Sequence, residues 1–133
     1  MTHSFLIDTN IYSCAMRGDR EVVQALQQMN HIAIAVISIG ELLSGFKAGT
    51  KEKENRRQLH AFLDSPRVGI YNTDENTAEF YSAVLNQLKL QGTPIPTNDI
   101  WIAATAFQHG LPVYTKDAHF SHIKGLILME SFG

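Results

Sequence analysis

The stretch Phe5-Leu6-Ile7-Asp8-Thr9-Asn10 decides how the rest of the sequence is interpreted. Three apolar residues, typical of a buried strand, run directly into an acid and two polar residues, and a helical pattern follows over residues 11–17. In a sheet of parallel strands, such junctions lie at one edge, outside the carboxyl ends of the strands. The sequence therefore predicts that Asp8 lies at that edge.

Three further acids occupy similar junctions, where an apolar run gives way to a helical one. These acids are Glu41, Asp99 and Asp117. We expect all four carboxylates to meet at the same edge of the sheet, although they are far apart in the sequence. Carboxylate oxygens are the ligands that hard cations such as Mg²⁺ and Mn²⁺ prefer. The pattern therefore predicts a site for a divalent cation.

Strand-like and helix-like segments alternate along the chain. Besides the strand at residues 5–7, we predict strands at residues 32–37, 68–71, 112–114 and 127–129. We predict further helices at residues 19–29, 38–47, 51–64, 74–91 and 98–109, and a single turn at 118–122. This alternation predicts an α/β fold, with a mostly parallel sheet covered by helices on both faces, in one domain over residues 1–133. The strand at residues 68–71 has the weakest pattern, and we expect it at the sheet edge.

The composition is that of an ordinary globular domain. Hydrophobic residues make up 44% of the 133 positions and charged residues 18%, which argues against disorder. The formal net charge of -2 gives no overall basic field, so a nucleic acid would have to be held by a local patch or by metal ions. Cys14 is the single cysteine, which rules out an internal disulfide. We find no signal-like segment and no membrane-spanning run, and we expect a cytoplasmic protein.

Each acid also has a purely structural interpretation. Ser38-Ile39-Gly40-Glu41 matches an S-x-x-E capping box, which by itself would explain Ser38 and Glu41. Asp8 and Asp117 could cap the helices that follow them, and Asp99 lies in a first turn, where the helix dipole favours negative charge. For any one of these acids taken alone, capping is the preferred interpretation.

The four acids together favour metal binding. Two unit charges about 4 Å apart repel by roughly 4 kcal/mol at an effective dielectric constant of 20. No Lys or Arg flanks Asp8, Glu41 or Asp99 in the sequence. We therefore expect one or two divalent cations to neutralise the negative charge of the four acids. Asp19 and Asp74 also begin predicted helices, and position alone does not separate them from the four. Asp74, however, follows the strand that we expect at the sheet edge.

Four segments of the chain resemble the motifs of PIN-domain ribonucleases, and most closely those of the VapC toxins of bacterial toxin–antitoxin pairs. The segments are, in order, Leu6-Ile7-Asp8-Thr9-Asn10, Ile37-Ser38-Ile39-Gly40-Glu41-Leu42-Leu43-Ser44-Gly45, Asn98-Asp99-Ile100-Trp101-Ile102-Ala103-Ala104-Thr105-Ala106, and Tyr114-Thr115-Lys116-Asp117 with Phe120. The resemblance extends nearly from end to end. It implies a three-layer α/β/α sandwich with a central five-stranded, mostly parallel sheet.

The same resemblance implies an activity and partners. The implied protein is a cytoplasmic toxin that hydrolyses RNA phosphodiester bonds with Mg²⁺ or Mn²⁺, with tRNA among the targets to consider. It forms a homodimer and is blocked by a cognate antitoxin protein. The site residues carried over by motif are the metal-binding acids Asp8, Glu41 and Asp99, the more variable fourth acid Asp117, the hydroxyl of Thr115 that positions water or phosphate, and Asn10, which could also cap a helix.

Other polar residues allow weaker interpretations. Lys116 and Lys124 lie near the expected site and are candidate phosphate contacts. For the basic residues of segment 51–57 we prefer a solvated helix face, and the alternative is a contact with the RNA backbone or a partner. His119 and His122 are interpreted as surface histidines rather than as a metal pair. Trp101 is expected to pack in the core or at a dimer face rather than against a base.

The sequence pattern allows two other functions. A PIN fold without catalysis could serve as an RNA- or protein-binding module, although the intact set of four acids argues against it. A phosphotransfer enzyme of the haloacid-dehalogenase type also begins with a strand and an Asp. That chemistry expects a second Asp two residues later, and Asn10 occupies the position here. The sequence therefore favours the nuclease.

Overall fold

The computed structural model describes residues 3–129. Strands and helices alternate along this part of the chain, as predicted. The elements are β1 (Ser4–Ile7), α1 (Thr9–Met16), α2 (Arg20–Gln28), β2 (His31–Ala35), α3 (Val36–Ala48), α4 (Glu52–Leu63), β3 (Val68–Tyr71), α5 (Glu75–Gln91), α6 (Thr97–His109), β4 (Val113–Tyr114) and the 3-10 helix η1 (Ala118–His122).

The strands form one parallel sheet in the order β3-β2-β1-β4. Ile7 near the end of β1 is paired with Ile34 on one side and Tyr114 on the other, so these strands end side by side. As expected, β3 lies at the sheet edge. The predicted mostly parallel sheet is confirmed.

The predicted fifth strand at residues 127–129 is wrong as a strand. Leu128 forms an isolated parallel bridge with Val113, supported by backbone hydrogen bonds from Val113 to Ile127 and from Met129 to Val113. This bridge involves one residue of the two-residue β4, and an isolated bridge is not a strand. The described sheet therefore has four strands, with residues 127–129 lying along its β4 edge.

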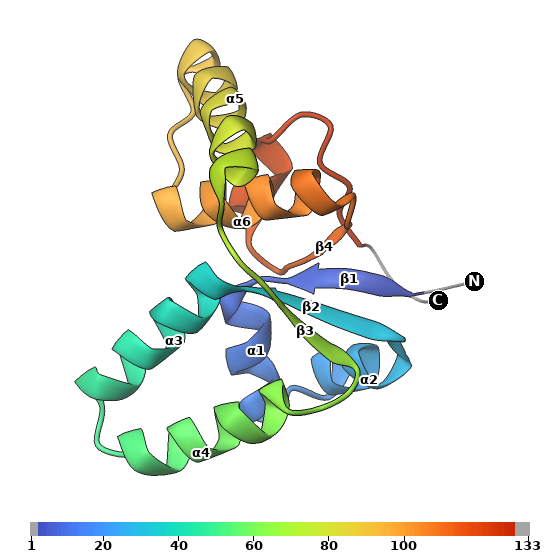
Figure 1. Ribbon diagram of the computed structural model, residues 1–133, viewed down its shortest axis with the longest axis vertical. Coiled ribbons are helices and arrows are strands. Elements are labelled where there is room, and N and C mark those ends of the chain that lie inside the picture. The colour runs from blue at the N-terminus through green and yellow to red at the C-terminus, as the bar shows by residue number, and fades with distance from the viewer. Residues whose placement is uncertain (1–2, 130–133) are drawn as a thin grey trace.

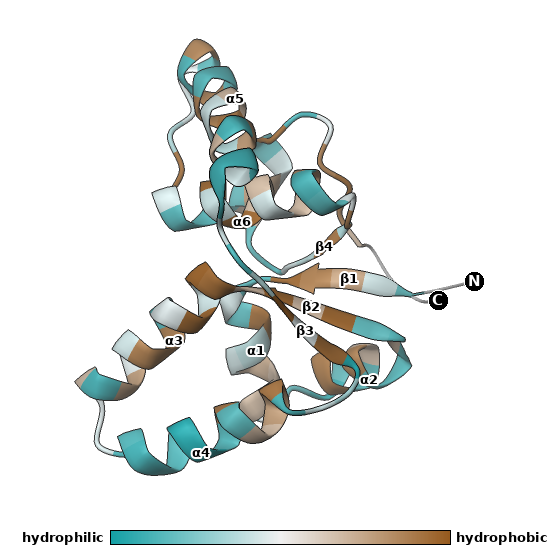
Figure 2. Ribbon diagram, viewed as in Figure 1, coloured by the Kyte–Doolittle hydropathy of each residue, from teal (hydrophilic) through white to brown (hydrophobic). Residues whose placement is uncertain are grey.

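Apolar layers cover both faces of the sheet. Ile7 and Ile34 point into a cluster formed with α1 to α4, whereas Leu6 and Ala33 point into a second cluster formed with α5, α6 and η1. This split follows from the alternation of side chains along a strand. Figure 1 shows α1 to α4 on one side of the strands and α5 and α6 on the other, and Figure 2 shows the apolar colour along much of β1, β2 and β3. The predicted three-layer α/β/α architecture is confirmed.

The junction between β2 and α3 differs from the prediction. The sequence predicted a strand through Ile37, but β2 ends at Ala35 and Val36 already belongs to α3. Two β-branched residues therefore form the first turn of a helix, so their weak preference for strands does not decide the local structure here. Within residues 3–129, no helix is both long and apolar enough to cross a membrane.

Candidate metal centre

The structure brings the four predicted acids to the carboxyl edge of the sheet. Asp8 directly follows β1, Glu41 lies in α3 after β2, Asp99 lies in the first turn of α6, and Asp117 precedes η1 after β4. Burial is the main cause of the raised pKa values of Asp8 and Asp99, and the charges of nearby acids raise them further: Asp99 and Asp117 act on Asp8, and Asp117 and Glu41 act on Asp99. The expected convergence of the four acids is therefore observed.

Asp8 is the most deeply buried of the four, with 2% of its surface exposed. Its Oδ1 accepts the Ile11 amide N–H at 2.9 Å, so Asp8 does cap α1. Its Oδ2 accepts a hydrogen bond from the Thr115 hydroxyl at 2.5 Å, and the same hydroxyl accepts the Asp117 N–H at 2.9 Å. Burial raises the pKa of Asp8 more than these hydrogen bonds lower it. Thr115 thus ties the end of β4 to the Asp8 carboxylate.

Glu41 does not belong to a capping box, so that alternative was wrong. Because α3 begins at Val36, its N-cap is Ala35, which makes no side-chain capping bond. Ser38 is fully buried, and its hydroxyl makes no hydrogen bond. Glu41 instead accepts a hydrogen bond from the Thr9 hydroxyl at 2.7 Å, and Thr9 directly follows Asp8. This contact turns Glu41 toward the other acids rather than toward its own helix start.

His119 joins this cluster, which the sequence interpretation missed. Its Nδ1 lies 3.0 Å from Asp99 Oδ2 and 3.0 Å from Asp117 Oδ1. Because ionised carboxylates only accept hydrogen bonds, Nδ1 carries the proton in this arrangement. Asp117 also caps η1 by accepting the His119 N–H at 2.9 Å. The position of His119 two residues after Asp117 could have indicated its contact with Asp117 from the sequence. Its contact with Asp99 depends on the tertiary fold. His122 is exposed, as predicted.

Asp74 and Asp19 lie outside the cluster and act as caps. Asp74 forms a capping box with Thr77 at the start of α5 and also accepts a hydrogen bond from Gln108. The backbone hydrogen bond from Thr77 is the main reason that the pKa of Asp74 is lowered. Asp19 caps α2 and lies 3.3 Å from the Lys116 ammonium. Their positions at helix starts therefore have a complete structural explanation.

The remaining predicted contacts have mixed outcomes. Lys116 is half-exposed and pairs with Asp19, and its role toward phosphate stays a prediction. Asn10 is exposed in the first turn of α1, and it is not the cap of that helix, because Asp8 is. Trp101 stacks on Tyr81 with ring centroids 4.0 Å apart, so it packs between α5 and α6. Lys124 is exposed.

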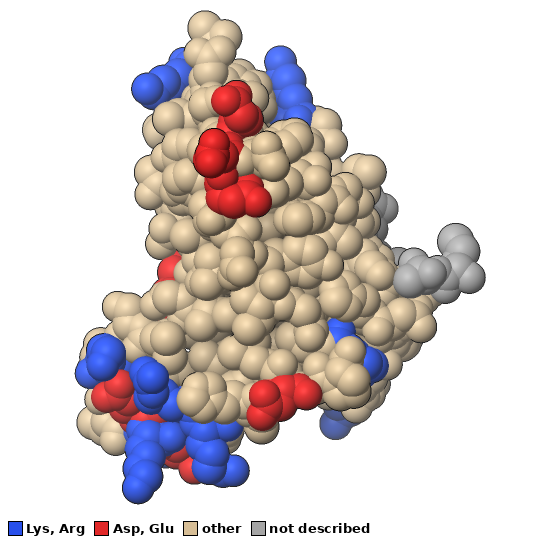
Figure 3. All heavy atoms as spheres, in the orientation of Figure 1, with Lys and Arg blue, Asp and Glu red and all other residues tan. Residues whose placement is uncertain are grey.

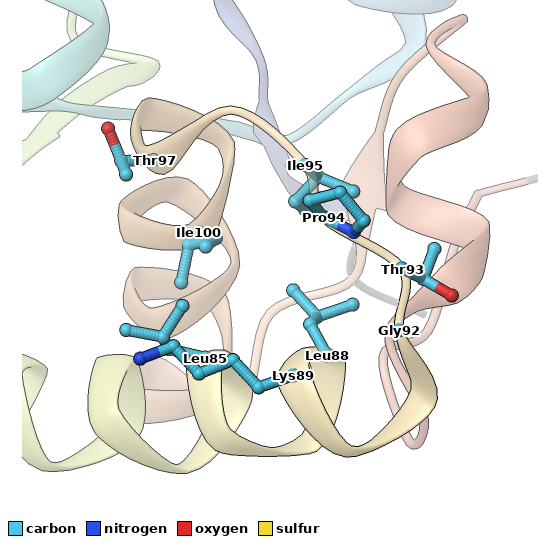
Figure 4. Close-up of a pocket in the computed structure, with 9 residues that line it drawn as sticks. All are labelled: Leu85, Leu88, Lys89, Gly92, Thr93, Pro94, Ile95, Thr97 and Ile100. Carbon is cyan, nitrogen blue, oxygen red and sulfur yellow. The ribbon is translucent and has the colours of Figure 1, made fainter.

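An apolar pocket between α5 and α6 is separate from this cluster. A cavity of about 250 Å³ lies between the end of α5 and the start of α6 and is lined by Leu85, Leu88, Ile95 and Ile100 among others (Figure 4). None of the four acids lines it, and its walls offer no titratable group other than Lys89. The chemistry therefore resides at the sheet edge rather than in this cavity.

The donor set at the sheet edge fits a divalent cation. Asp99 and Asp117 each present a carboxylate oxygen within 4.8 Å of the other, and carboxylate oxygens are the ligands that Mg²⁺ and Mn²⁺ prefer. In residues 3–129, no Lys or Arg forms an ion pair with any of the four acids. The raised pKa values of Asp8 and Asp99 reflect this uncompensated, partly buried negative charge. A cation would supply the missing compensation.

Known proteins share both the sequence pattern and the fold. The PIN-domain family model matches residues 5–126. The toxin FitB of Neisseria gonorrhoeae is 30% identical over 84% of this chain and 86% of its own, and the ribonuclease VapC5 of Mycobacterium tuberculosis is 26% identical over 94% of this chain and 91% of its own. The structure of VapBC2 from Rickettsia felis bound to a promoter DNA fragment matches with a TM-score of 0.86 and 27% identity, covering 95% of this chain and 97% of that chain. The chain therefore belongs to the PIN-domain family, alongside the VapC ribonucleases and the toxin FitB.

Proposed function

We propose that this chain is the toxin of a VapBC-type toxin–antitoxin pair, an endoribonuclease that uses a divalent metal to hydrolyse RNA phosphodiester bonds. The observation that carries the proposal is the convergence of Asp8, Glu41, Asp99 and Asp117 at one sheet edge without a Lys or Arg ion pair in the described part of the chain. We further propose that residues 1–133 make up a single PIN domain.

The proposed metal is Mg²⁺ or Mn²⁺, held by Asp8, Glu41, Asp99 and Asp117. Such a cation supplies a Lewis acid that activates water and neutralises charge on the scissile phosphate. Since Mg²⁺ keeps several waters and takes one or two carboxylates directly, the other acids act through water. Thr115 fixes the orientation of Asp8 through its hydroxyl. Asn10 and Lys116 flank this site and are proposed to contact the substrate.

The proposed partners follow from the relatives. Solved structures of similar proteins include toxin–antitoxin complexes, such as the one from Klebsiella pneumoniae that is 29% identical to this chain, so we assign a protein antitoxin as a partner. RNA is the proposed substrate, with tRNA among the targets, and the proposed assembly is a homodimer. A cytoplasmic location follows from that substrate.

The test is cleavage of structured RNA by the purified, antitoxin-free protein. We expect cleavage in Mg²⁺ or Mn²⁺, none in EDTA, and none from the Asp8→Asn variant. The alternative is a catalytically silent PIN module that binds RNA or a protein. That alternative would replace our proposal if the wild-type protein bound RNA, cut no RNA in either metal, and bound equally well after Asp8→Asn.

The pH dependence of stability tests the charge cluster. Because the pKa values of Asp8 and Asp99 are raised in the folded state, the folded state binds their protons more tightly than the unfolded state does. Their contribution to stability is therefore present at low pH and is lost as pH rises from about 4 through the raised values. We expect Mn²⁺ to raise the melting temperature by several degrees at pH 7.5 and less at pH 5. Thermal unfolding with and without Mn²⁺ measures this, and an equal effect at both values would contradict it.

His119 is expected to position Asp99 and Asp117 through its Nδ1 donor. In the His119→Asn variant, an amide N–H can occupy the place of Nδ1, whereas His119→Gln places its amide nearer the position of Nε2. We expect His119→Ala and His119→Gln to weaken Mn²⁺ binding by about 10-fold, and His119→Asn to retain most of it. Titration of Mn²⁺ by electron paramagnetic resonance compares the three variants. Equal losses in all of them would show that the donor at Nδ1 does not matter.

A further inference from the structure

Nearly half of the positive charge of the chain gathers where α3 turns into α4. Segment 47–57 holds five of the 11 Lys and Arg residues but two of the 13 acids, a local charge of +3 in a chain whose formal net charge is -2. Figure 3 shows this group at the end of the molecule farthest from α5. We call it the basic tip, and its cations are Lys47, Lys51, Lys53, Arg56 and Arg57.

The internal ion pairs of the basic tip leave cations unpaired. Glu52 lies 3.3 Å from the Lys47 ammonium and 3.7 Å from the Arg56 guanidinium, and Glu54 takes both hydrogen bonds of Arg57. Lys51 and Lys53 are exposed and form no ion pair within residues 3–129. A solvated helix face explains Arg56 and Arg57, but it gives no partner to the two lysines. Exposed ion pairs are also weak, so the paired cations can exchange their partners for a phosphate.

Helix α3 connects the basic tip to the metal-binding acids. Glu41 and Ala48 lie on one face of α3, and seven residues of helix separate them by about 10 Å along the axis. On the same face, Ser44 and Gly45 are exposed and small, and a Cβ atom added at Gly45 would meet nothing within 4 Å. No bulky side chain on this face stands between the acid cluster and the tip. A short stretch of single-stranded RNA covers this distance.

We propose that the RNA strand cut at the acid cluster continues along α3 and is held through its phosphates by the basic tip. This inference rests on the proposed nuclease function and deepens it. Binding at the tip is electrostatic and independent of base sequence, because Lys and Arg contact the phosphates that every nucleotide carries. In a chain with net negative charge, the tip supplies the local attraction that a polyanionic substrate requires.

The first experiment reverses the charge of the two unpaired lysines. In the Lys51→Glu/Lys53→Glu variant we expect KM for a long RNA to rise about 10-fold with kcat unchanged. The slope of log KM against log salt concentration should also decrease by about 1.4, because each lost phosphate contact on a single strand removes about 0.7 from that slope. Acids at the start of α4 suit the helix dipole, so folding is not at risk. The control is Arg20→Glu/Lys89→Glu, which changes net charge equally on α2 and α5 and should leave KM within about twofold.

The second experiment places a charge on the path itself. Glu, Gln and Lys have similar helix propensities and all exceed Gly, so substitutions at Gly45 preserve folding while varying charge alone. We expect Gly45→Glu to raise KM relative to Gly45→Gln, and Gly45→Lys to lower it. A two-nucleotide substrate, which does not reach the tip, should show no effect of Lys51→Glu/Lys53→Glu.

The outcomes separate this inference from the proposed function. If the wild-type protein cuts no RNA in Mg²⁺ or Mn²⁺, the nuclease function fails. If it cuts RNA but the tip variants keep the KM and salt dependence of the wild type, the inferred path alone is wrong. Unchanged RNA kinetics together with weaker binding of the antitoxin would assign the tip to the protein partner instead.

Discussion

Asp99→Asn is expected to lower RNA cleavage on the order of 1000-fold while raising the melting temperature of the metal-free protein. The loss of activity follows because an amide cannot replace a carboxylate as an anionic metal ligand. The gain in stability follows because burial and the charges of Asp117 and Glu41 raise the pKa of Asp99, which means that its negative charge is disfavoured in the fold. Functional sites commonly carry such a cost in stability. Single-turnover cleavage and thermal unfolding in EDTA measure the two effects.

Asp74→Asn is the matched control: we expect it to retain RNA cleavage and to lower the melting temperature, whereas Asp99→Asn should lose cleavage and raise the melting temperature. Asp74 also begins a helix after a strand, but its carboxylate accepts hydrogen bonds from Thr77 and Gln108, and its pKa is lowered. Its charge therefore stabilises the fold. We expect Asp74→Asn to keep cleavage near the wild-type rate and to lower the melting temperature slightly, because Asn remains an acceptable N-cap. If Asp99→Asn retained substantial cleavage, Asp99 would not be the metal ligand that we propose.

Phe120→Ala is expected to produce the largest loss of stability, about 3–5 kcal/mol in the free energy of unfolding. Phe120 is fully buried in the apolar layer under α6, and it is the buried residue of η1. Since η1 carries His119 and is capped by Asp117, the cavity should also loosen both groups. Urea denaturation measures the first effect, and Mn²⁺ titration well below the melting temperature measures the second.

An exposed apolar residue nearby provides the comparison for Phe120. Ile127 has 68% of its surface exposed, and the hydrogen bond that it forms with Val113 uses its backbone carbonyl. Ile127→Ala should therefore change the free energy of unfolding by less than about 0.5 kcal/mol and leave Mn²⁺ binding unaltered. A Phe120→Ala variant with the wild-type Mn²⁺ affinity would show that the packing of η1 does not control the site.

The sequence predicted the elements wherever apolar periodicity was long, and it predicted the acids from their junctions. It failed at Val36 and Ile37, which are β-branched but helical, because the strand preference of single residues is weak and depends on their surroundings. The same failure produced the false capping box at Ser38. The S-x-x-E pattern indicates a capping box only if its Ser is the N-cap of the helix. Here α3 begins at Val36, two residues before Ser38, so Ser38 cannot be that cap.

His119 shows a different limit of sequence reasoning. Its link to Asp117 is local, but its link to Asp99 joins positions 20 residues apart and exists only when η1 packs against α6. Periodicity carries no information about such a contact. The Thr115 hydroxyl was anticipated through the family motif, yet its bond to Asp8 likewise depends on β1 and β4 being neighbours.

The hydrogen bond between Thr115 and Asp8 also determines when the acid cluster can form during translation. Its two partners lie 107 positions apart, and β4 joins the sheet beside the first strand to emerge. At roughly 5–20 residues per second, a ribosome takes several seconds to make the segment that brings Thr115, Asp117 and His119 to Asp8. A nascent chain that ends before β4 carries three of the predicted groups, Asp8, Glu41 and Asp99, without the segment that orients them. The cluster can therefore be completed only after β4 and η1 have been translated.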